Sequence, residues 1–168
     1  MKKTARGFTL VELLVVIAII AILAAVVVLI INPIELTKRS RDAARLTDLA
    51  NLQQAINVAA QEATASGAAI LCSGTTAPCQ GDSKADGRAS DGSGWVKVNL
   101  SAQKSVSVPT LPIDPINDDT YKYSYYSDGN AWEINAVLES DQQKGKMSTD
   151  GGNNDNAYEV GSNLTLLP

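Results

Sequence analysis

The sequence predicts an α+β protein in which a long N-terminal helix, kinked near Pro33, packs on a small antiparallel β-sheet. Three observations predict this fold. Residues 13–31 form an uninterrupted run without a polar side chain. Apolar residues then recur at steps of three and four as far as Ala65, as on one face of a helix. Beyond residue 94, apolar and polar residues alternate in short runs, as in half-buried strands.

The run from Leu13 to Ile31 is long enough to span a membrane. As a helix it extends about 28 Å, close to the roughly 30 Å thickness of the hydrocarbon layer. A cleavable secretory signal has a shorter apolar core followed by an A-x-A-like site, and the alanines of this run offer no such site. The composition therefore favours a membrane-spanning helix over an ordinary signal peptide.

A single carboxylate, Glu12, precedes this run. Carrying its charge toward the bilayer centre costs up to about 3 kcal/mol. The carboxylate either stays at the headgroup level or pairs with a cation, and a free amine at Phe8, formed if the chain is cut after Gly7, is the nearest candidate. Phe8 and Glu12 are one helical turn apart, so this pair forms either within one chain or between chains. Buried ion pairs contribute little stability but fix register.

The segment Gly7-Phe8-Thr9-Leu10-Val11-Glu12, after its short basic leader, resembles the processing motif of type IV pilins and of the pseudopilins of type II secretion. The resemblance implies that a prepilin peptidase cuts between Gly7 and Phe8 and that the Phe8 amine is methylated. It also implies that Glu12 pairs with the N-terminus of a neighbouring subunit during assembly. The segment from Leu111 to Asn117, with the tyrosines that follow it, is similar to a loop and strand of the same family.

We expect the chain to divide into four segments. These are a cleaved leader at residues 1–7, a transmembrane and filament-core helix at 8–31, an amphipathic helix joining stem to head at 32–65, and a globular head at 66–168 with a disulfide-containing loop, an antiparallel sheet and a polar C-terminal loop.

The helix is interrupted at Pro33, which cannot donate a helical hydrogen bond and clashes with the preceding turn. Asn32, Pro33 and Glu35 also suit the N-cap, first and third positions of a new helix. The chain therefore either kinks or stops and restarts here. Residues expected to face the sheet beyond this point are Leu46, Leu49, Leu52, Ile56, Ala59, Ala60 and Ala63. Residues expected to face away are Arg41, Asp42, Arg45, Asp48, Gln53 and Glu62.

The head begins with a segment, residues 66–94, that is rich in Gly, Ser, Ala and Asp and predicts a long surface loop. Strands are predicted at 95–100, 121–125 and 131–138, with a turn at Ser127–Asn130 joining the last two. Three or four antiparallel strands would form the sheet.

The amino-acid composition argues against two classes of function, an enzyme and a nucleic-acid-binding protein. The sequence lacks His and shows no nucleophile–base pair, so we expect no enzyme. Residues 62–168 carry 14 acidic and 7 basic side chains, which disfavours binding of nucleic acid through its phosphates. Cys72 and Cys79 are the only cysteines. One closely spaced pair in an exported domain predicts a local disulfide, with free thiols as the alternative.

The tail from Glu139 onward is polar and rich in Gly and Asn. Major pseudopilins often bind calcium in a C-terminal loop, so the resemblance makes Asp150, Asn153 and Asp155 weak calcium candidates, although their spacing matches no ligand pattern. We expect no other cofactor.

The expected function is structural, as a subunit of a helical filament. The resemblance implies self-association, an inner-membrane assembly platform and an assembly ATPase as partners, and lipid around the helix before assembly. The head would lie outside the cytoplasm, and the filament would be extracellular or periplasmic. The basic residues after the apolar run are expected to meet lipid headgroups before assembly and acidic neighbours after it: Lys38, Arg39, Arg41 and Arg45.

Two machines are open within this class. A surface pilus suits the long loop and the disulfide, whereas a type II secretion pseudopilus suits the segment from Leu111 to Asn117. In a different class, a monomeric membrane-anchored module would bind a ligand through its head. That alternative does not explain why Gly7, Phe8 and Glu12 occur in this arrangement.

Overall fold

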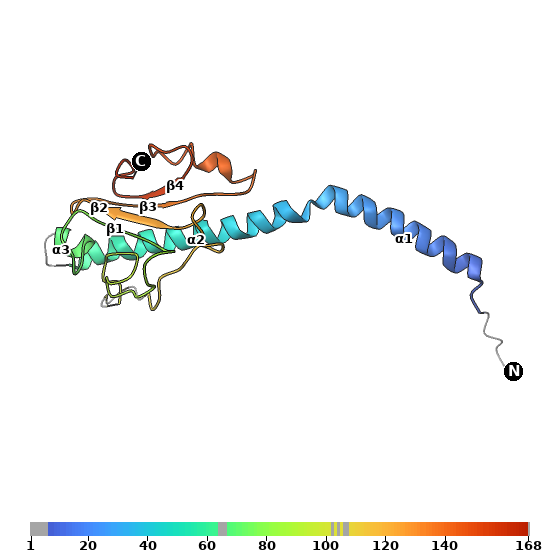
Figure 1. Ribbon diagram of the computed structural model, residues 1–168, viewed down its shortest axis with the longest axis horizontal. Helices are drawn as coiled ribbons and strands as arrows, with labels where there is room; N and C mark the ends of the chain where they lie inside the picture. Colours follow the sequence, from blue (N-terminus) through green and yellow to red (C-terminus); the bar gives the residue numbers. More distant parts are fainter. Residues whose placement is uncertain (1–6, 64–66, 102, 104, 106–107, 168) are drawn as a thin grey trace. The chain divides into compact units, whose positions relative to one another are not determined.

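The computed structural model describes residues 7–63, 67–101, 103, 105 and 108–167, of which residues 29–31 and 67 are described by their backbone alone. The chain divides into two compact units, one ending at Thr37 and the other beginning at Lys38. Helix α1 belongs to the first unit and the β-sheet to the second (Figure 1). The first six residues of the expected leader, and the expected boundary between residues 65 and 66, lie outside the described residues.

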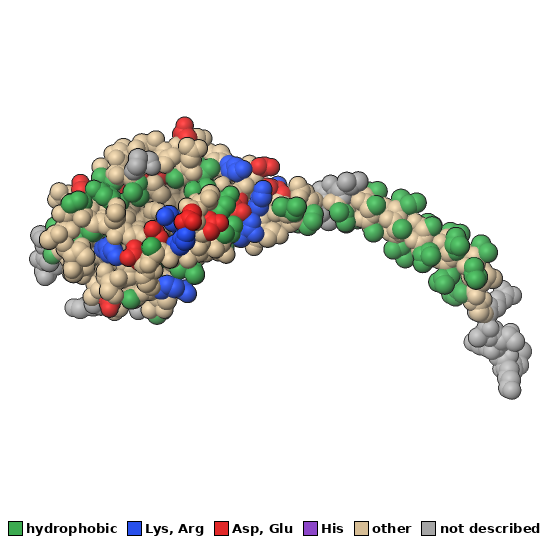
Figure 2. All heavy atoms as spheres, in the orientation of Figure 1, with side chains coloured by type: hydrophobic (Ala, Val, Ile, Leu, Met, Phe, Trp, Pro, Cys, Tyr) green, Lys and Arg blue, Asp and Glu red, His purple; other side chains and the backbone are tan. Residues whose placement is uncertain are grey.

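Helix α1 spans Leu10–Ile31 and confirms the predicted long apolar helix. Among the described residues it is the one helix long and apolar enough to cross a membrane, from Leu10 to Val28. Its large apolar side chains between Leu10 and Val28 are exposed, and Figure 2 shows them along the visible face of the helix. Because apolar surface of this extent is unfavourable in water, α1 requires lipid or other helices around it.

Helix α1 ends at Ile31 and is followed by its C-cap, Asn32, whose φ of 41° lies in the left-handed region that asparagine tolerates better than most residues. Helix α2, Pro33–Glu62, begins at the next residue. The side-chain Oδ1 of Asn32 accepts a hydrogen bond from the backbone N–H of Glu35 (3.4 Å) and so caps the new helix. Of the two alternatives at Pro33, the helix stops and restarts.

In the second unit, α2 lies along the sheet (Figure 1). It buries an apolar stripe formed by Leu49, Leu52, Ala55, Ile56 and Ala59. These residues share one hydrophobic core with residues of the strands and loops that include Trp95, Leu111, Tyr123, Tyr125 and Ile134. Of the other positions predicted for this stripe, Leu46 and Ala63 are half-buried and Ala60 is exposed.

The sheet has four antiparallel strands in the order β1-β2-β3-β4. Their bounds are Cys79–Asp82, Ser124–Ser127, Trp132–Ala136 and Tyr158–Gly161. The predicted hairpin is confirmed by β2 and β3. In its turn, the carboxylate of Asp128 accepts hydrogen bonds from the backbone N–H groups of Asn130 and Ala131, and Gly129 adopts a φ of 93° that favours glycine.

The strand predicted over residues 95–100 is wrong. The segment forms only one isolated bridge, at Asn99. Trp95 and Val96 are consecutive, yet both are fully buried, so the segment crosses the core instead of turning one face toward it. Its backbone bonds to a loop, where the N–H of Trp95 donates to the carbonyl of Gly87 (2.9 Å).

Regular elements also lie where the sequence predicts loops. The segment at 66–94 contains a short helix, α3, at Gly67–Leu71, as well as β1. The polar tail contains β4 and a 3₁₀ turn, η1, at Lys144–Lys146. The residues of β1 carry no β-forming signature. Gly81 is required there because a side chain would meet the backbone of Trp95.

Candidate functional site

The first turn of α1 holds the carboxylate of Glu12 against its own backbone. The Oγ1 of Thr9 accepts a hydrogen bond from the backbone N–H of Glu12 (3.3 Å), and the backbone N–H of Thr9 donates to Oε2 of Glu12 (2.8 Å). This reciprocal capping box satisfies two donors that a helix start otherwise leaves unpaired. Glu12 is therefore held by its own chain, one turn from Phe8.

Gly7 and Phe8 precede the helix and are exposed. Among the described residues, no heavy atom beyond the chain neighbours lies within 4 Å of the position that a Cβ would occupy at Gly7, and Phe8 is 86% exposed. The bond between them lies outside the hydrogen-bonded turn that begins at Thr9. The structure thus leaves this bond accessible to a protease.

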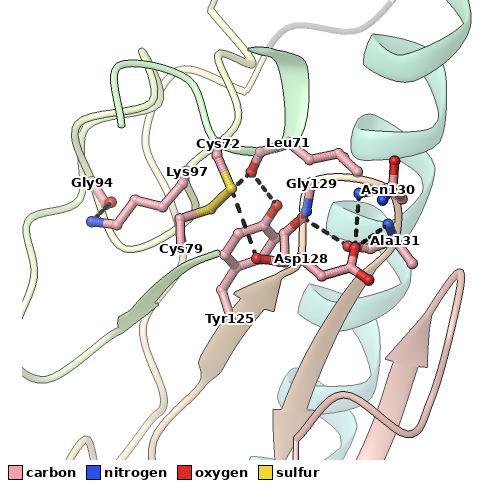
Figure 3. Close-up of a disulfide and its surroundings, with 11 residues drawn as sticks. Leu71, Cys72, Cys79, Gly94, Lys97, Tyr125, Asp128, Gly129, Asn130 and Ala131 are labelled. Atoms are coloured by element: carbon pink, nitrogen blue, oxygen red, sulfur yellow. Dashed lines mark hydrogen bonds between the residues drawn. A yellow bond between two sulfur atoms is a disulfide. The ribbon is translucent and has the colours of Figure 1, made fainter. Parts of the chain in front are cut away.

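Cys72 and Cys79 form a disulfide in the head, with their Cα atoms 5.7 Å apart (Figure 3). Cys72 follows α3 and Cys79 begins β1, so the bond ties these two elements together. The hydroxyl of Tyr125, in β2, donates to the carbonyl of Leu71 (2.7 Å) and fastens the same junction. Both cysteines are buried.

Two charged residues of α2 that were expected to face away from the sheet, Asp42 and Arg45, are instead buried. The guanidinium of Arg45 donates to both carboxylate oxygens of Asp114 (2.6 and 2.9 Å), to Asp42 (2.9 Å) and to Glu139 (2.5 Å). Arg41 donates twice more to Glu139. Arg45 is fully buried, so the expectation that it meets lipid headgroups is wrong.

This network joins α2 to the chain after β3. Asp42 accepts hydrogen bonds from the backbone N–H groups of Glu139 and Ser140 at 2.7–3.1 Å. The hydrogen bond from Arg41 holds the pKa of the Glu139 carboxyl below its usual range, against the opposing effect of burial. The network therefore depends on Glu139 remaining ionised.

Of the three calcium candidates, Asp150 and the exposed Asn153 contact the segment around Glu159, and Asp155 is exposed. Asp150 accepts hydrogen bonds from the backbone N–H groups of Gly152 (3.0 Å) and Glu159 (2.9 Å). These bonds shape the loop around Asn153.

The side-chain amide of Asn153 lies among oxygen atoms. It is 2.9 Å from the carbonyl oxygen of Leu164, 3.1 Å from that of Leu167 and 3.2 Å from Oε1 of Glu159. Turned toward them, its NH₂ group has two hydrogens for three acceptors. In this orientation the amide donates to these oxygens and ties the C-terminal tail to Glu159.

Two glutamates that sequence reasoning missed complete this cluster. Glu133 of β3 and Glu159 of β4 are 0% and 2% exposed. The Oε2 of Glu133 accepts hydrogen bonds from the backbone N–H groups of Leu166 and Leu167, and its Oε1 is buried without a hydrogen-bond partner in the described part of the chain. Burial, reinforced by the nearby carboxylate of Glu133, raises the pKa of Glu159 to about 7.

The side chains and carbonyls of this cluster face one another with oxygen atoms. Carboxylate, amide and carbonyl oxygens are the ligands that Ca²⁺ prefers. An ion here would satisfy the buried Oε1 of Glu133 and offset two carboxylates. The described residues hold no group of three or more His, Cys, Asp or Glu side chains suited to a metal, so amide and carbonyl oxygens would have to complete the set.

Comparison with known proteins identifies the N-terminal segment. Residues 2–28 match the family model described as the prokaryotic N-terminal methylation motif, which is the signature of type IV pilins and pseudopilins. The N-terminal segment of the chain is therefore similar to that of type IV pilins and pseudopilins. No curated protein and no solved structure matches the chain.

Proposed function

We propose that the chain is a prepilin, the structural subunit of a helical type IV-like filament. The observation that carries the proposal is the position of Glu12, in the first turn of a membrane-length helix and within the matched methylation motif. A peptidase would cut after Gly7, and the new amine of Phe8 would be methylated. The exposed bond between these residues supports this order of events.

In this proposal α1 is stored in the membrane and then packs into the filament core. Lipid and a helix bundle are similarly apolar, so the transfer changes little hydrophobic free energy. The carboxylate of Glu12 would leave Thr9 for the N-terminus of a neighbouring subunit. Any other register leaves its charge unpaired, and the pair therefore selects the register of assembly.

The proposed partners are other copies of the chain, a prepilin peptidase, an inner-membrane platform and an assembly ATPase. The head would lie outside the cytoplasm and the filament on the cell surface. The long segment between α2 and β2, with its disulfide, supports a pilus. The alternative is a type II secretion pseudopilus, supported by the segment from Leu111 to Asn117. Loss of secretion on gene deletion, with surface fibres intact, would favour the pseudopilus.

A second candidate is a membrane-anchored binding module without enzymatic activity. A groove of about 510 Å³ beside α2 favours it, since small-ligand sites have this size. Its polar lining includes Asp48, Asn51 and Arg88. This candidate ranks second because it gives no task to Glu12 and the methylation motif.

We further propose that the cluster around Glu133 and Glu159 holds Ca²⁺. The ligands would be Oε1 of both glutamates, the carbonyls of Leu164 and Leu167 and, with its amide turned, the oxygen of Asn153. Asp150 would shape the loop, and Asp155 would take no part. The ion would fasten the C-terminal tail to β3 and β4.

The filament proposal is tested by Glu12→Ala, with Glu35→Ala as the matched control at an acid outside the apolar run. Both variants are expressed in cells that assemble the wild-type chain. We expect Glu12→Ala to remain in the membrane fraction and to give no filaments by electron microscopy, while Glu35→Ala assembles. Normal filaments from Glu12→Ala would refute the role of this carboxylate.

A further inference from the structure

The sequence contains two Asn-x-Ser/Thr tripeptides, Asn99-Leu100-Ser101 and Asn163-Leu164-Thr165. This tripeptide is the acceptor of N-linked glycosylation, and its use requires an exposed position in an exported protein. We infer that Asn163 is a site of N-linked glycan attachment and that Asn99 is not. The two positions differ in burial and in what surrounds them.

Asn163 lies in the short connection after β4, where both it and Thr165 are exposed. The hydroxyl of Thr165 donates to the amide oxygen of Asn163 (2.9 Å). No hydrogen bond in the described part of the chain involves the amide nitrogen of Asn163. The atom that would be modified is therefore available, and the hydroxyl that defines the tripeptide already contacts the amide.

The residues on either side of this turn are anchored. The N–H of Ser162 donates to the carbonyl of Trp132 (2.9 Å), and the N–H of Leu166 donates to Glu133 (2.7 Å). Asn163 is thus presented outward by a fixed turn. A glycan attached there displaces no residue of the hydrophobic core.

Asn99 is built into the fold. It is half-buried, forms a bridge with Asp91, and is followed by Leu100, which is fully buried. Its amide oxygen accepts hydrogen bonds from both the backbone N–H and the hydroxyl of Ser101 (3.2 and 2.9 Å). A glycan here would require this segment to leave the core, which makes Asn99 an internal control.

The co-substrate class is an oligosaccharide linked to a polyprenyl pyrophosphate. The amide nitrogen of Asn163 would form a bond to the anomeric carbon of the first sugar. The bond from that carbon to the pyrophosphate oxygen breaks, polyprenyl pyrophosphate leaves, and the amide gives up one proton. This step rests on the proposed function, because α1 would hold the head at the membrane surface where a lipid-linked donor resides.

The test is peptide mapping by mass spectrometry of the full chain purified from its own cells. We expect the peptide containing Asn163 to carry a glycan and the peptide containing Asn99 to have its unmodified mass. Asn163→Gln and Thr165→Ala should both abolish the added mass, whereas Thr165→Ser and Asn99→Gln should retain it. An unmodified Asn163 peptide from the wild-type chain would overturn the inference.

The same digest reports on the filament proposal independently. An N-terminal peptide that begins at methylated Phe8, together with an unmodified Asn163, would contradict the glycan site and leave the filament proposal in place. An N-terminal peptide that begins at Met1 would contradict the filament proposal, whatever the state of Asn163.

Discussion

Arg45 and Asp114 form a bidentate ion pair in which both side chains are fully buried, each with an exposure of 0%. Arg45 comes from the middle of α2, whereas Asp114 lies in the loop between two prolines that leads toward β2. Asp114 also accepts hydrogen bonds from the backbone N–H groups of Ile116 and Asn117. The pair therefore fixes both the helix and the loop.

Replacing Arg45 is expected to destabilise the head strongly. Arg45→Ala leaves the buried carboxylates of Asp42 and Asp114 without their counter-charge, and breaking one partner of a buried pair typically costs about 3–5 kcal/mol. Thermal unfolding in detergent measures this loss. Arg39→Ala, at an exposed arginine of the same helix, should change the stability by no more than about 0.5 kcal/mol. Equal Tm values for the two variants would contradict a structural role for the network.

The contribution of Glu139 is expected to disappear in acid. Its folded pKa lies below the ordinary value of 4.5, chiefly because of the hydrogen bond from Arg41. A carboxyl with a lowered pKa adds stability that is complete above 4.5 and is lost as the pH falls through the folded value. The Tm difference between wild type and Glu139→Gln should therefore be large at pH 7 and shrink below pH 4.5. A difference that does not change with pH would show that packing, not charge, holds this residue.

The disulfide is expected to stabilise the head by closing a short loop. With a sequence separation of 7, loop-closure entropy predicts about 2–3 kcal/mol. The double variant Cys72→Ser/Cys79→Ser should unfold at a correspondingly lower temperature. Mass spectrometry after alkylation without reductant checks the bond itself, and two alkylated cysteines in the wild-type chain would rule it out.

Calcium is expected to raise the Tm of the wild-type chain. Saturation at 100 times Kd corresponds to about 2.7 kcal/mol of added stability. Glu133→Gln and Glu159→Gln should abolish the response, and Asp155→Asn should preserve it because Asp155 lies outside the proposed ligand set. A wild-type Tm that is the same in calcium and in chelator would remove the site.

The sequence predicts those features of the fold that depend on neighbouring residues or on one continuous run of residues. The apolar run of α1, the break at Pro33 and the hairpin turn at Asp128 all follow from residue types that act on their immediate neighbours. Strand β1 could not be predicted, because its residues carry no β-forming signature and join the sheet by pairing with the distant β2. The strand expected at residues 95–100 failed for the converse reason, since burial on both sides overrode its alternation.

The charged network shows a signal that was present but overlooked. Asp42 and Arg45 continue the same steps of three and four that lead to Leu49 and Leu52, so they occupy the buried stripe of α2 despite their charge. Their charge suggested that these two residues lie on the exposed face of α2, but their spacing places them on the buried face. Glu133 and Glu159 gave no comparable signal, because strand pairing brings them together across 25 residues of intervening sequence.

The mass and N-terminal sequence of the mature protein from its own cells test the central claim most directly. A filament subunit processed at the methylation motif is predicted to begin at Phe8 with an N-methylated amine. A chain that still begins at Met1 would contradict the account, and would leave a membrane-anchored binding module as the better description.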